Sequence, residues 1–439
     1  MSIEGVNRFT SIVLNHIFAN QNATGNVALS GISLYVLLGA INIGLQRQSY
    51  NQLSRFLGEG FEELQDTGTW MDSHTAQKWT RLVDLASEFY MVTSALFCSC
   101  DINYHYKTVS DLLLRLHKIN VNFSNPYPSD RNIYTLISMY AFGSKINEFE
   151  KSKLGEDGMI FMDAIFVSLN WQKKFNASHT ETDIFYDNKG QTLEVEMMNQ
   201  EGFNFIYDSY DHVFQVLFIR FKELFQFAAI LLPREGHTIE DALTTFKFDD
   251  IYTYFTQSPI KYINLKMPKF KISSDKDYVQ TFKDFGIADI FDRTHSDFGK
   301  MTNQTVFIGK LIQLLNVAVG ELGVKADDNT DDFSEKSSSE PEKGGDTVVE
   351  TRADAEGRAH SDAEDSYDPE DNQQLETDES EDSDEKSNSE SEEERVFLAE
   401  KVPSDSEPFH VNRPFIFIIY SSTSNAALFS AFVTNPNTA

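Results

Sequence analysis

Cysteine and long apolar runs are both scarce in this chain. Among its 439 residues, only Cys98 and Cys100 are cysteine. Their one-residue spacing strains a mutual disulfide, and two thiols are too few ligands for a zinc site, so the fold must depend on its apolar core. No stretch approaches the roughly 18 consecutive apolar residues that cross a bilayer, so we expect no membrane-spanning segment.

Motifs typical of enzymes are also missing. The sequence contains no Gly-rich phosphate loop, no His-Glu-x-x-His and no Gly-x-Ser-x-Gly, and its ten histidines are scattered. His179, His212 and His237 lie in turn-like sequence, which is typical of solvated side chains. We therefore expect no enzyme activity, no cofactor and no metal site.

A convincing secretion signal is not present near the N-terminus. Residues 11–18 are largely apolar but lack a basic flank and an unbroken apolar centre, so they predict an amphipathic helix. Four Asn-x-Ser/Thr sequons occur, but sites of this kind arise by chance in an Asn-rich chain. On these grounds we expect a cytoplasmic address.

The negative charge of the chain is local. Residues 324–408 hold 31 acidic and 8 basic side chains, a net charge of −23 out of −31, so the remainder carries −8. Such a segment repels phosphate backbones and acidic lipid surfaces, which argues against nucleic-acid and membrane partners. It is also too poor in apolar residues to offset backbone ordering, which costs about 1–2 kcal/mol per residue. We predict a disordered insertion.

The rest of the chain mixes helical and strand patterns. Apolar residues make up 41% of the sequence, enough for a sizeable core. Apolar spacing predicts helices over 5–19 and 33–57, and polar helices near 108–118, 131–143 and 277–285. Strand patterns occupy 26–30, 160–169, 215–220, 227–232, 263–267 and 415–420, while 60–80 gives no clear pattern. This mixture indicates an α+β fold.

Several motifs, in a fixed order, carry a family resemblance. The C-terminal part reads Asn412-Arg413-Pro414-Phe415 before two apolar strands. Earlier motifs are Asn26-Val27-Ala28-Leu29-Ser30-Gly31-Ile32-Ser33, Asp163-Ala164-Ile165-Phe166-Val167-Ser168-Leu169-Asn170-Trp171, Met267-Pro268-Lys269-Phe270 and Phe285-Gly286-Ile287-Ala288-Asp289-Ile290-Phe291. Together they resemble the serpins, a family of serine protease inhibitors.

This resemblance implies an architecture. A serpin fold is α+β, with a large mixed main β-sheet, two further sheets and about eight to nine helices. It would comprise residues 1–323 and 409–439, interrupted by the acidic insertion at 324–408 in the reactive-loop region. The resemblance also implies a monomer. It implies an extracellular location as the alternative to the cytoplasmic one.

The resemblance further implies the positions of a hinge, a breach and a shutter. Glu321-Leu322-Gly323 is similar to the family's Glu-Glu-Gly hinge, and Val324 and Ala326 follow it. Trp171 corresponds to the breach tryptophan. In the shutter, Ser30 and Ser33 match the family, whereas Asp163 stands where asparagine is usual and Gln313 where histidine is frequent. A hydrogen bond from Gln313 to the Asp163 carboxylate is expected to substitute.

The family's mechanism requires that the cleaved loop can be buried in the main sheet. A protease cleaves the exposed loop and forms an acyl-enzyme, and the severed loop enters the main sheet as a new strand that drags the enzyme with it. With a period of two, Asp328 and Asp332 would face the core together with Val324, Ala326 and Thr330. An unpaired buried charge costs several kcal/mol, so these carboxylates oppose full insertion.

No single bait bond is predicted by the sequence. Counting forward from Glu321 places the bond near Ser337, and counting back from Asn412 places it near Pro403-Ser404. Basic candidates are Arg352, Arg358 and Arg395. An inserted strand of about 14 residues spans roughly 45 Å, whereas even a cut at Arg352 leaves 28 residues after Val324. A tether of that length would be slack.

Two hypotheses follow. In the first, the protein is a serpin that inhibits a serine-type protease through a bait within 324–408. In the second, it keeps the fold without the trap and uses the acidic segment to bind basic proteins or Ca²⁺.

Overall fold

The structure is a computed structural model that describes residues 3–22, 25–87, 90–121, 155, 157–325 and 406–438. The chain divides into two compact units, residues 1–329 with 403–439, and residues 330–402. All described residues belong to the first unit. Several predictions lie outside the described residues: the helix near 131–143, Ala326, and the bait candidates Ser337, Arg352, Arg358, Arg395, Pro403 and Ser404.

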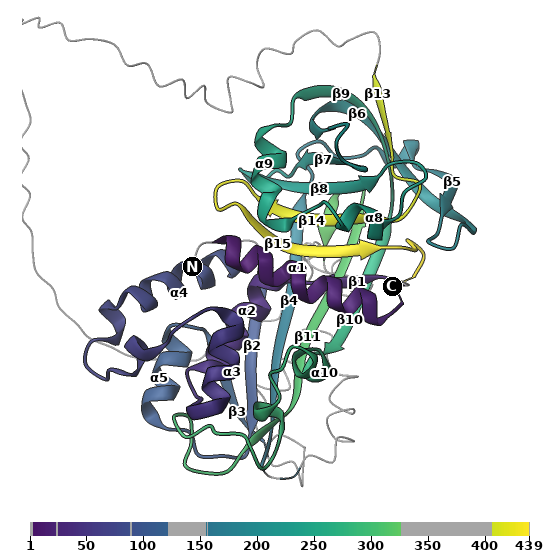
Figure 1. Cartoon of the computed structure of the whole chain (residues 1–439). Coiled ribbons are helices and arrows are strands. Elements are labelled where there is room, and N and C mark those ends of the chain that lie inside the picture. Colours follow the sequence, from purple (N-terminus) through teal and green to yellow (C-terminus); the bar gives the residue numbers. More distant parts are fainter. Residues whose placement is uncertain are drawn as a thin grey trace, which may run out of the picture. The chain divides into compact units, whose positions relative to one another are not determined.

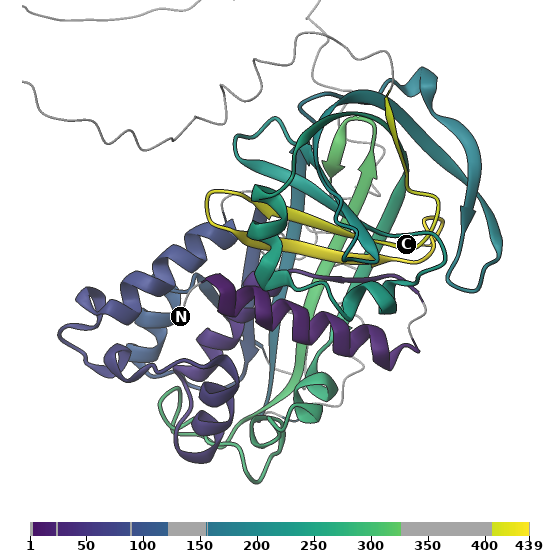
Figure 2. The ribbon, with the colours of Figure 1, turned by 45° about the horizontal axis from the view of Figure 1, so that its top comes forward.

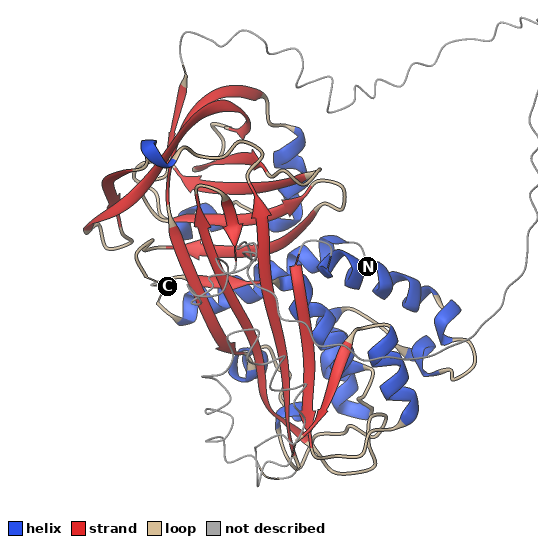
Figure 3. Ribbon diagram, turned by 180° about the vertical axis from the view of Figure 1, so that it is seen from behind, coloured by secondary structure: helices blue, strands red, loops and turns tan. Residues whose placement is uncertain are grey.

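The first unit contains a mixed sheet of six strands, here called the central sheet, in the order β10-β11-β12-β4-β2-β3. Figure 3 shows its long strands side by side. The bounds are β2 Tyr90–Cys98, β3 Leu116–Asn120, β4 Gly158–Asn170, β10 Phe270–Asp277, β11 Phe307–Gly320 and β12 Gly323–Lys325. The pairs β11–β4 and β2–β3 are parallel and the others antiparallel. The main sheet is therefore mixed, as the resemblance implied.

The remaining strands form one hydrogen-bonded set of nine, in the order β1-β15-β14-β8-β7-β6-β9-β13, with β5 paired to β6. Their bounds are β1 Val27–Leu29, β5 Glu181–Tyr186, β6 Thr192–Tyr207, β7 Phe214–Arg220, β8 Gln226–Pro233, β9 Ile260–Pro268, β13 Glu407–His410, β14 Phe415–Ser421 and β15 Ala426–Val433. The long β6 pairs with β5 and β9 along most of its length and with β7 only at its end. It therefore joins the two further sheets of the expected fold.

Eight α-helices accompany these sheets in the described part of the chain. They are α1 Ile3–Asn20, α2 Gly31–Asn42, α3 Arg47–Leu57, α4 His74–Ser87, α5 Tyr104–Leu112, α8 Ile239–Leu243, α9 Ile251–Thr256 and α10 Val279–Asp284. Figures 1 and 2 show α1 and the last two strands, β14 and β15, crossing the same face of the central sheet. Within the described residues, no helix has both the length and the hydropathy to cross a bilayer.

Helix α2 lies at the centre of the core, and every one of its residues is buried. It contacts α1, β15 and β4. Its first residue is Gly31, where the family motif has proline. A Cβ atom added at Gly31 would lie 1.8 Å from Oγ1 of Thr10, so the side chain of α1 occupies that space. Close packing of α1 on α2 therefore requires glycine here.

Most predicted elements are confirmed, with two corrections. The single helix predicted over 33–57 is wrong, because the chain leaves the helix between Asn42 and Arg47. There the carbonyl of Gly44 accepts hydrogen bonds from the backbone N–H groups of Lys300 and Met301 instead of a helical partner. The helix predicted near 108–118 is likewise too long: α5 ends at Leu112, and residues 116–120 form β3, because their backbone pairs with β2.

Candidate functional site

The hinge folds back into the central sheet. After β11 ends at Gly320, Glu321 and Leu322 form a turn, and β12 lies between β11 and β4 with antiparallel pairing to both. A Cβ atom at Gly323 would lie 1.9 Å from the carbonyl oxygen of Leu169, and the φ of Gly323 is +152°, so only glycine fits. Val324 is fully buried. Three residues therefore fill the start of a slot between two long strands.

Nearer the first residues of β11 and β4, where β12 does not reach, these two strands pair directly with each other. β11 and β4 are parallel neighbours from Phe307 opposite Gly158 to Asn316 opposite Phe166. We call this stretch the seam. Any longer inserted strand must separate the seam, because neighbouring strands lie only about 4.8 Å apart.

The breach tryptophan fastens the turn to the end of β4. The indole Nε1 of Trp171 donates to the carbonyl oxygen of Gly320 at 2.8 Å, and its backbone N–H donates to that of Leu322 at 3.0 Å. The ring is buried and stacks on Phe221, with centroids 4.7 Å apart and planes 9° from parallel. Trp171 thus holds the hinge through both its backbone and its side chain.

Glu321 anchors the same turn by charge. Nζ of Lys269 lies 2.7 Å from its Oε1, and Oγ1 of Thr180 donates to the same oxygen at 2.9 Å. Burial alone would raise the pKa of Glu321, but the hydrogen bonds from Lys269 and Thr180 outweigh it and lower the pKa. Lys269 also pairs with Glu196 at 3.2 Å, on the solvent side.

The shutter residues meet in the interior, where the start of α2 lies against the seam. The amide of Gln313 forms two bonds with the backbone of Ser30: Oε1 accepts from its N–H at 3.0 Å, and Nε2 donates to its carbonyl at 3.1 Å. Nε2 of Gln313 also donates to Oδ2 of Asp163 at 3.1 Å, which is the hydrogen bond expected from the sequence. The hydroxyl of Ser30 donates to the carbonyl of Leu428 on β15 at 2.9 Å.

Asp163 is the only fully buried carboxylate side chain in the described part of the core. Its Oδ2 accepts from Oγ of Ser33 at 2.5 Å, and its Oδ1 accepts from Oγ of Ser94 at 3.0 Å. Burial raises the pKa of Asp163, and the three hydrogen bonds oppose that shift only in part. The group is therefore easier to protonate than an ordinary aspartate.

The predicted residues thus form two clusters. Ser30, Ser33, Asp163 and Gln313 converge in the shutter, and Trp171, Glu321, Gly323 and Val324 converge at the breach. Sequence reasoning missed four contributors to these clusters: Ser94, Thr180, Phe221 and Lys269. Lys269 lies within the Met-Pro-Lys-Phe motif, which was the only signal available for it.

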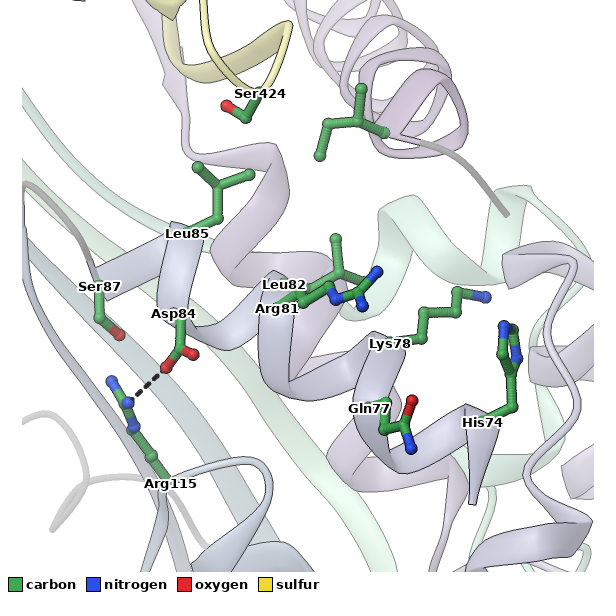
Figure 4. Close-up of a pocket in the computed structure, with 11 residues that line it drawn as sticks. His74, Gln77, Lys78, Arg81, Leu82, Asp84, Leu85, Ser87, Arg115 and Ser424 are labelled. Atoms are coloured by element: carbon green, nitrogen blue, oxygen red, sulfur yellow. Dashed lines mark hydrogen bonds and ion pairs between the residues drawn. The ribbon is translucent and has the colours of Figure 1, made fainter. Parts of the chain in front are cut away.

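An open pocket of about 860 Å³ lies elsewhere, along α4. Figure 4 shows Arg115 facing Asp84. The two form an ion pair in which the nitrogen and oxygen atoms are 2.7 Å apart. Lys78 pairs with Glu59. The pocket contains no residue of the hinge, breach or shutter. Because two of its cations are already neutralised, we assign it no function. Within the described residues, no cluster of three His, Cys, Asp or Glu side chains could hold a metal ion.

A family model covers most of this chain. It is described as serpin (serine protease inhibitor) and matches residues 4–353. The chain belongs to the serpin family. Serpins are protease inhibitors as a class, and the recognition made from the sequence motifs is thereby confirmed.

Individual serpins are distant from this chain in sequence. Alpha-1-antiproteinase S of the guinea pig (Cavia porcellus) is 22% identical over 71% of this chain and 76% of its own length. Serine proteinase inhibitor 1 of vaccinia virus (strain Western Reserve) is 25% identical over 71% and 85%. Serpin B5 of Xenopus laevis is 27% identical over 71% and 82%.

Solved structures share the fold. Mouse protein Z-dependent protease inhibitor aligns with a TM-score of 0.70 at 17% identity, covering 99% of this chain and 96% of its own. Human thyroxine-binding globulin, solved in complex with thyroxine, aligns with a TM-score of 0.68 at 15% identity, covering 99% of both chains. At this identity the likeness shows the fold alone. The name of the first neighbour refers to protease inhibition, and the name of the second refers to binding of thyroxine.

Proposed function

We propose that this serpin inhibits serine-type endopeptidases. Residues 324–408 would contain the bait bond that the protease cleaves. The observation that carries the proposal is the position of β12. Gly323–Lys325 already lies between β11 and β4, and Val324 is buried there. After cleavage, the severed loop would extend β12 between β4 and β11, towards the first residues of these strands, and would separate the seam. Insertion would therefore begin from a hinge that already lies within the sheet.

The register of β12 determines where each later residue would fall. Val324 lies opposite Leu169 on β4 and opposite Val319 on β11. Continued in that register, Thr330 would fall between Asp163 and Gln313, and its hydroxyl could replace their hydrogen bond. The shutter therefore presents a polar pair at the first core-facing position after Val324 that carries a hydroxyl.

Two carboxylates would fall in a different environment. Asp328 would fall between Ile165 and Leu315, which are register partners in the seam and both buried. Asp332 would fall between Phe161 and Leu311, which are partners in the same way and fully buried. Transfer of a carboxylate into such surroundings costs several kcal/mol or requires its protonation. Insertion therefore meets its first obstacle at Asp328.

This obstacle favours a second candidate function. A serpin whose loop stops before Asp328 would be cut without trapping the protease. Its acidic segment, with a net charge of −23 over 324–408, would then serve as a binding arm for basic proteins or Ca²⁺.

Incubation with trypsin-like and chymotrypsin-like proteases, followed by denaturing electrophoresis, tests the proposal. A complex that survives denaturation supports inhibition, whereas simple nicking of the chain favours the binding arm. The nicked protein is then heated. A rise in melting temperature means that the loop has entered the sheet, and an unchanged melting temperature means that it has not.

One pair of variants tests the role of the carboxylates directly. The double variant Asp328→Ala/Asp332→Ala removes both obstacles and is expected to gain thermal stability on nicking, even if the wild type does not. Asp327→Ala is the matched control, because in the same register it falls between the half-buried Phe166 and Asn316. If the double variant and the control behave alike, the carboxylates are not what limits insertion.

A further inference from the structure

The side chains of Asp163 and Gln313 cross the seam at its centre. They are register partners on β4 and β11, and both are fully buried. The orientation of the Gln313 amide is fixed, because its oxygen accepts from the backbone N–H of Ser30. Its Nε2 must therefore face Asp163. Admitting another strand roughly doubles the separation of β4 and β11, to about 10 Å, which breaks this bond.

The carboxyl group of Asp163 faces only neutral neighbours in the described structure. Ser33 approaches it from α2, Ser94 from β2 and Gln313 from β11. The one other titratable group is the phenol of Tyr278, just before α10. That phenol is fully buried, and burial and the charge of Asp163 raise its pKa far above neutrality. None of the ion pairs among the described residues includes Asp163.

Both protonation states of Asp163 fit these neighbours. In the ionised state, both oxygens accept, which satisfies the three donors. In the neutral state, Oδ2 still accepts from Ser33 and Gln313, and the proton on Oδ1 is donated to Oγ of Ser94, 3.0 Å away. Gaining or losing a proton therefore requires no rearrangement of the backbone.

We propose that Asp163 is a proton-dependent latch of the central sheet: the protonated carboxyl group holds the seam closed, and release of its proton to solvent makes the seam easier to open. The reason is the difference between the closed and open states. In the closed seam, an ionised Asp163 is buried without a cation, which is costly. When the strands separate, water reaches the carboxylate and that cost falls.

The pH dependence follows from linkage. Burial raises the pKa of Asp163 above its ordinary value of 3.8 in the closed state, and hydration returns the pKa towards that value when the seam opens. Below 3.8 the proton is bound in both states and closure is fully favoured. As the pH rises through the closed-state pKa, the opening equilibrium increases, by about tenfold for each unit that separates the two pKa values.

Hydrogen–deuterium exchange of the full chain, without protease, tests the latch. Exchange is followed in peptides that cover β4 and β11 from about pH 4.5 to 8, and intrinsic exchange rates are divided out to give the opening equilibrium. In the wild type this equilibrium is expected to rise with pH. In Asp163→Asn it is expected to be constant, since the amide cannot ionise. Asp211→Asn, in an exposed loop, should retain the wild-type profile.

A second variant keeps the test decisive if Asp163→Asn folds poorly. Ser33→Ala removes one donor to Oδ2, which weakens the ionised form more than the neutral one. The midpoint of the wild-type rise should therefore move to higher pH. A flat wild-type profile, an unchanged slope in Asp163→Asn or an unmoved midpoint in Ser33→Ala would each overturn the proposal.

Discussion

Nζ of Lys269 and Oε1 of Glu321 are 2.7 Å apart, and this ion pair ties the segment after β9 to the turn that reverses the chain into β12. Side-chain exposure is 28% for Lys269 and 18% for Glu321, so solvent screens the pair only in part. The pair therefore restrains the point from which any loop insertion begins.

Neutralising one partner should weaken this restraint. Glu321→Gln removes the charge while keeping the shape of the side chain. We expect a loss of roughly 1–2 kcal/mol in the free energy of unfolding, because the hydrogen bond from Lys269 is charge-assisted. Urea denaturation measures it. Glu196→Gln is the matched control, because it removes the charge of the other partner of Lys269. The side chain of Glu196 is 69% exposed, so this variant should lower the free energy of unfolding by less than about 0.5 kcal/mol. Equal losses in the two variants would contradict this assignment.

The same pair predicts a pH dependence with a definite sign. Hydrogen bonds from Lys269 and Thr180 lower the pKa of Glu321 below its ordinary value of 4.5, against the effect of burial. The carboxylate therefore contributes stability above pH 4.5, and this contribution is lost as the pH falls through its pKa in the folded state. The stability difference between wild type and Glu321→Gln should be constant near neutrality and shrink below pH 4.5. A difference that grows on acidification would show the opposite sign.

The sequence could predict that the shutter residues meet because Ser30, Ser33 and Asp163 belong to motifs with fixed spacing and the family resemblance supplied Gln313. Asp163 lies on a predicted strand, and its hydrogen bond to Gln313 required only that Gln313 lie on a neighbouring strand. It could not predict Ser94, because nothing local distinguishes that serine from any other in a strand. Nor could it predict that β12 separates β4 from β11 above Asn316, because that arrangement depends on contacts between residues more than 150 positions apart.

Helix boundaries show a similar limit. The apolar spacing of 33–57 continues smoothly through Gly44, so periodicity alone gives one helix. The break arises from residues 300 and 301, whose backbone N–H groups bind the carbonyl of Gly44. Tertiary hydrogen bonds of this kind leave no trace in local sequence.

Trp171 should contribute to stability through a polar bond as well as through burial. Trp171→Phe keeps a ring that can stack on Phe221 but loses the hydrogen bond to the carbonyl of Gly320. We expect a loss of about 0.5–1.5 kcal/mol beyond the change in buried area, since a half-buried hydrogen bond is lost. Chemical denaturation measures the loss.

Trp79 offers a matched control for this prediction. It is equally buried and also stacked, on Tyr35, but its Nε1 has no hydrogen-bond partner among the described residues. Trp79→Phe should therefore lose apolar area without the polar penalty and be the milder change. A larger loss in Trp79→Phe than in Trp171→Phe would mean that the indole N–H at the breach contributes little.

The position of β12 between β11 and β4 depends on Gly323. In Gly323→Ala, the new Cβ would lie 1.9 Å from the carbonyl oxygen of Leu169, which belongs to the backbone of β4 and cannot move aside. We expect β12 to leave the slot, so that the amide hydrogens of Gly323–Lys325 lose their exchange protection by more than about tenfold. Gly320→Ala is the matched control at the other end of the same turn, because no atom lies within 4 Å of its added Cβ. It should retain the protection of β12. If β12 stays protected in Gly323→Ala, the sheet can accommodate a side chain at position 323. Glycine would then not be required for β12 to lie between β11 and β4.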